Sequence, residues 1–203
     1  MTERYRLSFT TGGLFLQEAP MVAACYLRLH DWMATRAQLR EENLLQVRTA
    51  SAATRISREI TARLQELTAD ELLVFPDLSL RDQANLLWVA VCRRYPFIRD
   101  FATEVLREHH LLLRRQLALT DFDSFFNSKA LWHAELDNIA RSTQLKLRQN
   151  LFRMLREADL ISDRHAIHPA QLSPSLARLL VRQGRQAFLV FPATDNDIQR
   201  WLQ

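Results

Sequence analysis

Two groups of basic and polar side chains in this chain are suited by type and position to bind a charged ligand. Their members are Arg48, Thr49, Ser51, Thr54, Arg55 and Arg58, and then Arg141, Ser142, Thr143, Lys146, Arg148, Gln149, Arg153 and Arg156. Neither Leu44–Arg58 nor Arg141–Arg156 contains an acidic residue. Guanidinium, ammonium and hydroxyl groups donate to phosphate, and Arg and Gln also match base edges. The pattern therefore favours binding of a polyanion.

Other reactive side chains do not combine into a catalytic or metal-binding pattern. His165 and His168 lack the Cys, Asp or Glu partners that a metal site needs. His109 and His110 are adjacent, so on a helix they point apart. No nucleophile is spaced with a base, and no carboxylate pair is spaced for acid–base work. We expect no catalytic residues, no metal and no cofactor, and a protein that is not an enzyme.

Glycine is scarce, with only 3 in 203 residues, namely Gly12, Gly13 and Gly184. Phosphate-cradling loops and tight hairpins both require glycine, because they need positive φ or close backbone approach. The sequence therefore lacks a Walker loop and a dinucleotide fingerprint, and a β-sandwich is disfavoured. We expect an all-α, compact multi-helix globule.

The charge is moderately basic, with 27 Lys and Arg against 23 Asp and Glu and a net charge of +4. All of these cations except Lys129 and Lys146 are arginines. Arginine offers a planar fork suited to phosphate and guanine, although a genome rich in G and C would produce the same bias. The positions of the arginines in the sequence must therefore decide whether they serve nucleic-acid binding.

The sequence predicts a cytoplasmic protein with no membrane segment. Cys25 and Cys92 lie in apolar helical runs and are expected to be buried free thiols of a reducing compartment. Met1–Arg6 contains no apolar signal core. The apolar runs Met21–Leu27 and Leu86–Cys92 are far shorter than the roughly 20 residues that span a bilayer.

Three- and four-residue apolar steps, together with capping residues, predict helices along most of the chain. Their expected ranges are 14–29, 31–45, 49–67, 68–76, 80–92, 96–117, 122–132, 135–140, 142–158, 173–183 and 195–203. The helix at 80–92 is apolar almost all round and is expected to be central. Residues 160–168 are expected to form a two-stranded wing or a plain loop, and Phe188–Phe191 a strand.

Two pairs of these helices have a helix-turn-helix-like layout. We expect an N-terminal region, residues 1–117, with the first pair at about 31–67. The C-terminal region, residues 118–203, would hold the second pair at about 135–168, winged if the strands form. In each pair the second helix turns Arg or Lys outward, opposite an apolar face.

A helix face with one sign of charge has three interpretations. It can be an ordinary solvated face, a nucleic-acid contact, or a contact for an acidic protein partner. Solvated faces usually mix both signs, because acid–base pairs four residues apart stabilise helices. The residues alone leave these alternatives open.

The sequence resembles the BrxA family, a small helical component of BREX (bacteriophage exclusion) defence systems, over nearly its full length. The segments that carry the resemblance are Tyr5, Phe9–Leu14, Asp31–Trp32, Asn43–Leu45, Arg55–Ile56, Glu59–Ile60, Arg63–Leu64, Leu87–Trp88, Phe101, Glu104–Leu106 and Thr143–Glu157. The order and spacing of these segments make the resemblance specific.

The resemblance implies a non-catalytic all-α protein that binds double-stranded DNA through helix-turn-helix elements, here Ser51–Arg63 and Arg141–Arg156. It also implies that the protein acts together with a DNA methyltransferase, an ATPase and other BREX components. Two alternatives remain: an assembly adaptor that docks on an acidic surface of a larger component, and an RNA-binding helical protein. The oligomeric state is open, with a monomer favoured.

Overall fold

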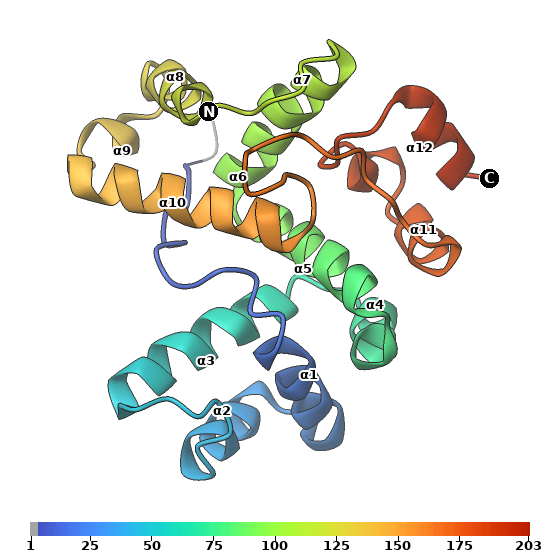
Figure 1. Ribbon diagram of the computed structural model, residues 1–203. Coiled ribbons are helices and arrows are strands. Elements are labelled where there is room, and N and C mark those ends of the chain that lie inside the picture. The colour runs from blue at the N-terminus through green and yellow to red at the C-terminus, as the bar shows by residue number, and fades with distance from the viewer. Residues whose placement is uncertain (1–3) are drawn as a thin grey trace.

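The computed structural model describes residues 4–203, so the expectation for Met1–Glu3 lies outside the described residues. The chain folds into a bundle of helices around the long helix α5 (Figure 1). Its α-helices are α1 (Glu18–Leu29), α2 (Trp32–Glu41), α3 (Ala50–Leu64), α4 (Ala69–Val74), α5 (Leu80–Arg94), α6 (Pro96–Phe101), α7 (Glu108–Leu111), α8 (Leu119–Ala130), α9 (Ala134–Asp137), α10 (Arg141–Glu157), α11 (Pro174–Val181) and α12 (Asp195–Trp201). The all-α fold predicted from glycine scarcity and helical periodicity is confirmed.

Side-chain caps begin several helices at the predicted residues. The Asp31 carboxylate accepts from the amides of Met33 and Ala34 at 2.5 and 3.1 Å and starts α2. The Thr49 hydroxyl accepts from the Ala52 amide at 3.2 Å and starts α3. These caps satisfy amides that the first helical turn leaves without partners.

The first predicted helix starts later than expected. Leu14 is fully buried, but α1 begins only at Glu18. Phe15 and Gly12 have φ of 61° and 66°, a conformation that interrupts a right-handed helix. Residues 5–14 form an irregular segment with a turn at Phe9–Thr10, and the apolar spacing that predicted a helix from Leu14 reflects burial in the core.

Helix α5 forms the centre of the core, as predicted. Every residue from Asp82 to Cys92 is buried, and the Trp88 indole donates to the Val190 carbonyl at 2.9 Å. One apolar cluster extends from Tyr5 to Ile198 and includes side chains of both predicted regions. Cys25 and Cys92 are buried free thiols, as expected. The division at residue 117 remains a prediction.

The helix predicted for 96–117 ends at Leu111, after a π-helical stretch at Ala102–Arg107. Leu113 has a φ of 58°, which turns the chain away from the helix axis. Gln116 then forms an antiparallel bridge with Ala166.

Residues 160–168 form a small hairpin with one bridge, between Ile161 and Ile167. The His168 amide donates to the Leu160 carbonyl at 2.9 Å, and the Ser162 amide donates to the Ala166 carbonyl at 2.8 Å. The strand predicted at Phe188–Phe191 is wrong. A 3₁₀ turn occupies Arg185–Phe188, because Gly184 with φ 72° starts a tight turn after α11.

Candidate nucleic-acid interface

Helix α3 separates an apolar face from a basic face. Ala53, Ile60 and Leu64 are buried, whereas Arg55 and Arg58 are exposed. The first turn consists of Ala50, Ser51, Ala52 and Ala53, so the positive end of the helix dipole faces no carboxylate of its own turn. Arg48, just before the helix, is also exposed.

Helix α10 has the same division. Leu147, Leu151 and Met154 are fully buried, and Lys146 and Arg153 are exposed. Its first turn contains Arg141, Ser142, Thr143 and Gln144. Ser142 and Gln149 are exposed, and Thr143 is half-buried. The helical projection from the sequence therefore places the outer face of this helix correctly.

Residues 5–14 form hydrogen bonds with both helices. The Asn150 side-chain amide on α10 donates to the Phe9 carbonyl at 3.0 Å, and Arg63 on α3 donates to the Gly13 carbonyl at 2.5 Å. The Leu14 amide donates to the Glu157 carboxylate at the end of α10. In Figure 1 both α3 and α10 begin on the left, with this segment between them. The first turns of the two helices therefore lie on the same side of the molecule.

Ser51, Thr54, Arg55 and Arg58 come together at a pocket of about 570 Å³ beside α3. The pocket also contains side chains outside the two predicted groups, namely Ser8, Thr10, Thr11 and Arg94. Ser8–Thr11 precede Gly12 and Gly13 and belong to no helical pattern. A search for hydroxyl runs beside glycines would have found them.

A second hollow, of about 430 Å³, shares Thr54 and Arg58 with this pocket. It is lined by Arg36 and Arg40 of α2 together with Thr54 and Ser57. The two α2 arginines are four residues apart, a spacing that places them on one helix face. That spacing is visible in the sequence, but the residues predicted to contact a ligand include none from α2.

Several cations of α10 face acceptors within the protein. Arg148 is half-buried and its guanidinium lies 2.5 Å from the Asp123 carboxylate. Arg153 pairs with Glu157 at 2.7 Å. Lys146 contacts the Gln149 amide oxygen at 3.2 Å. The formal charge of the α10 face is therefore partly neutralised, most completely at Arg148.

Arg63 has a structural position, although it lies within Ser51–Arg63, the element predicted to bind DNA. Its side chain is 1% exposed, and its Nε donates to Glu59 at 2.8 Å. Tyr95 also donates to Glu59. Burial, followed by the nearby Glu59 carboxylate, raises the pKa of Tyr95, so the phenol stays protonated as a donor. This network anchors α3 to α5 and to residues 5–14.

The connection lengths of the two helix pairs differ. Residues 138–140 join α9 to α10, which is the short turn typical of a helix-turn-helix. Residues 42–49 join α2 to α3, a longer connection that includes left-handed residues at Asn43 and Gln46. The second pair is therefore closer to the expected layout than the first.

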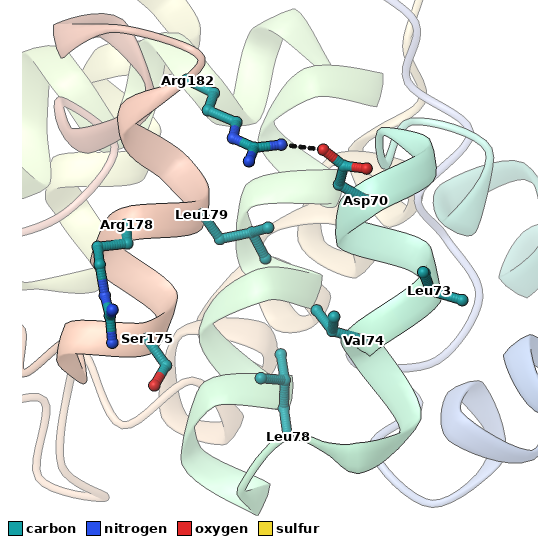
Figure 2. A pocket seen from close by; sticks show the side chains of 8 residues that line it. All are labelled: Asp70, Leu73, Val74, Leu78, Ser175, Arg178, Leu179 and Arg182. Carbon is teal, nitrogen blue, oxygen red and sulfur yellow. Dashed lines mark hydrogen bonds and ion pairs between the residues drawn. The ribbon is translucent and has the colours of Figure 1, made fainter.

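A different kind of groove, of about 450 Å³, lies between α4 and α11 (Figure 2). Val74, Leu78 and Leu179 point into it, and an ion pair between Arg182 and Asp70 crosses one end. Leu73 on its outer edge is 61% exposed. This groove is mainly apolar and lies on the opposite side of Figure 1 from the first turns of α3 and α10.

The described residues contain neither a metal-binding cluster nor a membrane-spanning helix. Within residues 4–203, no group of three or more His, Cys, Asp or Glu side chains could hold a metal ion. None of the helices in the same range is both long and apolar enough to cross a bilayer.

Known proteins resemble this chain both in sequence and in fold. A relative named BREX protein BrxA, from Escherichia coli O9:H4 (strain HS), is 27% identical over 177 residues, which cover 86% of this chain and 83% of that protein. The crystal structure of an uncharacterized protein from Magnetospirillum magneticum superposes with a TM-score of 0.80 at 20% identity, over 94% of this chain and 98% of that one. The latter similarity shows that the fold is shared.

The model of the BrxA family matches residues 3–184. This range contains the N-terminal segment, α3, α10 and the hairpin, and ends before α12. The chain belongs to the BrxA family.

Proposed function

We propose that this protein is a non-catalytic, cytoplasmic component of a BREX phage-defence system that binds double-stranded DNA. The contact surface, here called the basic face, consists of α3, α10 and residues 5–14 between them. One observation carries the proposal: α3 and α10 begin on the same side of the molecule. On these helices Arg55, Arg58, Arg141 and Lys146 are exposed. Helix N-termini and arginines are the groups that duplex-binding proteins present to phosphates.

The arrangement favours duplex DNA over a single strand of RNA. Single-strand binding relies on aromatic side chains on which bases stack. The residues that line the two hollows beside α3 are instead arginines, hydroxyl-bearing residues, Met33 and Glu59. These side chains therefore support contact with the phosphate backbone of a duplex.

The salt dependence of duplex binding tests this proposal. About five phosphate contacts would give a slope of log K against log salt of about −4 to −5. Fluorescence anisotropy of a labelled duplex, titrated with the wild-type protein at several salt concentrations, measures the slope. Binding that is absent at low salt, or independent of salt, would contradict duplex binding.

A second candidate function is docking on another component of the defence system. The groove between α4 and α11 favours it, because an apolar floor beside exposed Arg178 and Arg182 suits an acidic, amphipathic segment. Leu73→Glu would add a charge at the exposed edge of this groove without touching the basic face. Loss of association with a co-expressed BREX component, with duplex binding unchanged, would support docking.

A further inference from the structure

Five hydroxyl-bearing side chains and three arginines converge at the pocket beside α3. Its lining consists of Ser8, Thr10, Thr11, Ser51, Thr54, Arg55, Arg58, Glu59 and Arg94. Small-molecule pockets are mostly apolar with a few polar groups. A pocket lined largely by donors has the chemistry of an anion site instead.

The acidic side chain in this lining is already occupied. Oε1 of Glu59 accepts from Arg63 Nε at 2.8 Å and from the Tyr95 hydroxyl. Its side chain is 11% exposed, and Arg63 behind it is 1% exposed. Because Arg63 compensates this carboxylate, Arg55, Arg58 and Arg94 set the charge that a ligand meets.

The N–H groups of Arg94 are only weakly bonded within the protein. Its Nη1 lies 3.3 Å from the Ala62 carbonyl and 3.4 Å from Glu66, both long contacts. Within residues 4–203, its buried Nε has no hydrogen-bond partner. Arg93, by contrast, holds Glu71 with two bonds of 2.6 and 2.8 Å. A buried donor without a partner is costly, so the Arg94 guanidinium is less fully satisfied within the protein than that of Arg93.

The pocket wall formed by residues 8–11 is fixed in place. Phe9 is fully buried and its carbonyl accepts from Asn150. On the other side, the Gly13 carbonyl accepts from Arg63. The hydroxyls of Ser8, Thr10 and Thr11 are therefore presented by a backbone held at both ends, and ligand binding needs little ordering of the chain.

We propose that this pocket binds a phosphoryl group, with Arg55, Arg58 and Arg94 supplying charge and the hydroxyls of segment 8–11 supplying further donors. The phosphoryl group can belong to the backbone of the duplex or to a free nucleotide. The first source rests on the DNA-binding function proposed above, and the second does not. In either case the N-terminal segment, which lies outside both helix pairs, forms part of the binding surface.

Pyrophosphate and adenosine monophosphate are suitable probes, each titrated into the full-length protein by calorimetry. Arg94→Gln and, separately, Thr10→Val remove one donor group each, and Thr10 is exposed, so its variant should fold normally. Each variant should bind the anions about fivefold to tenfold more weakly than wild type. Arg81→Gln is the matched control, because Arg81 is exposed and lies near Asp159, at the far end of α10.

Competition with a labelled duplex separates the two sources. Displacement of the duplex by pyrophosphate, with weaker duplex binding by both variants, supports a backbone phosphate. Anion binding that the variants weaken, without displacement of the duplex, supports a free nucleotide.

Two results separate the failure of the pocket from the failure of the proposed function. The proposed phosphoryl site is overturned if the anions do not bind, or if they bind both variants as tightly as wild type. This holds even if the duplex binds. Wild-type protein that binds anions but no duplex leaves the pocket standing and overturns the proposed function.

Discussion

Lys146 and Arg148 are two residues apart on α10, and the structure gives them different surroundings. Lys146 is exposed beside Gln149, whereas Arg148 lies against Asp123. The other Asp123 oxygen is buried without a partner among residues 4–203, so this carboxylate depends on Arg148. The sequence shows both cations in one acid-free stretch and gives no sign that α8 supplies an acid.

Arg148→Gln should therefore lower stability, and Lys146→Gln should lower duplex affinity. Loss of the charged partner of a largely buried carboxylate costs about 2 kcal/mol, which is about 4–8 °C in Tm for a chain of this size. Thermal unfolding and duplex titrations on both variants measure the two effects. Equal losses of affinity with unchanged Tm would contradict this division.

Gly13 permits the close contact between residues 5–14 and α10. A Cβ at this position would overlap the Glu157 carboxylate, which accepts from the Leu14 amide and pairs with Arg153. Gly13→Ala should destabilise the fold by about 1–3 kcal/mol, because Glu157 must move. Urea unfolding measures this cost. Gly184→Ala is an informative comparison, because its Cβ would meet nothing within 4 Å and only its positive φ opposes the change.

At the scale of elements, the caps and apolar faces follow from local chemistry, which is why the sequence predicts them. Asp31, Thr49 and the Thr68–Glu71 capping box start their helices as expected. Elements that depend on distant partners were placed less well. Leu14 lies in the core and Phe15 and Leu16 pack against it without forming a helix, and Phe188–Phe191 follow a tight turn. Periodicity reports burial and cannot distinguish these cases.

The capping box of α12 makes a pH-dependent contribution to stability. The Thr194 hydroxyl donates to the Asp197 carboxylate at 2.6 Å, and this bond is the main cause that lowers the pKa of Asp197. A carboxyl with a lowered folded-state pKa stabilises the fold above its unfolded-state pKa, about 3.9. That contribution is lost as the pH falls through the lower folded-state value.

Asp197→Asn should therefore cost about 1 kcal/mol at neutral pH and much less in strong acid. Urea unfolding of wild type and variant across this pH range gives the difference, which isolates Asp197 from other titrating groups such as Glu135, whose pKa is also lowered. A difference that stays constant with pH would contradict the role of the charged carboxylate. Duplex binding should not change, because α12 lies outside the basic face.

At the scale of the whole molecule, the sequence could identify the two basic groups but could not bring them together. Their relative placement depends on residues 5–14, which contact α3 through Arg63 and α10 through Asn150 and Glu157. The same segment contributes Ser8, Thr10 and Thr11 to the pocket beside α3. Contacts between residues so far apart in sequence leave no periodic signal, so the surface emerges only in the folded chain.

Helices α3 and α10 should bind one duplex through a shared basic face. A double-mutant cycle between Arg55→Gln/Arg58→Gln and Arg141→Gln/Lys146→Gln tests it most directly, with the salt slope of duplex binding recorded for each protein and Arg81→Gln as the control. Each pair should reduce the slope by about two, and the combined variant should show both reductions nearly additively. A slope that changes for one pair only, or for neither, would contradict the shared face.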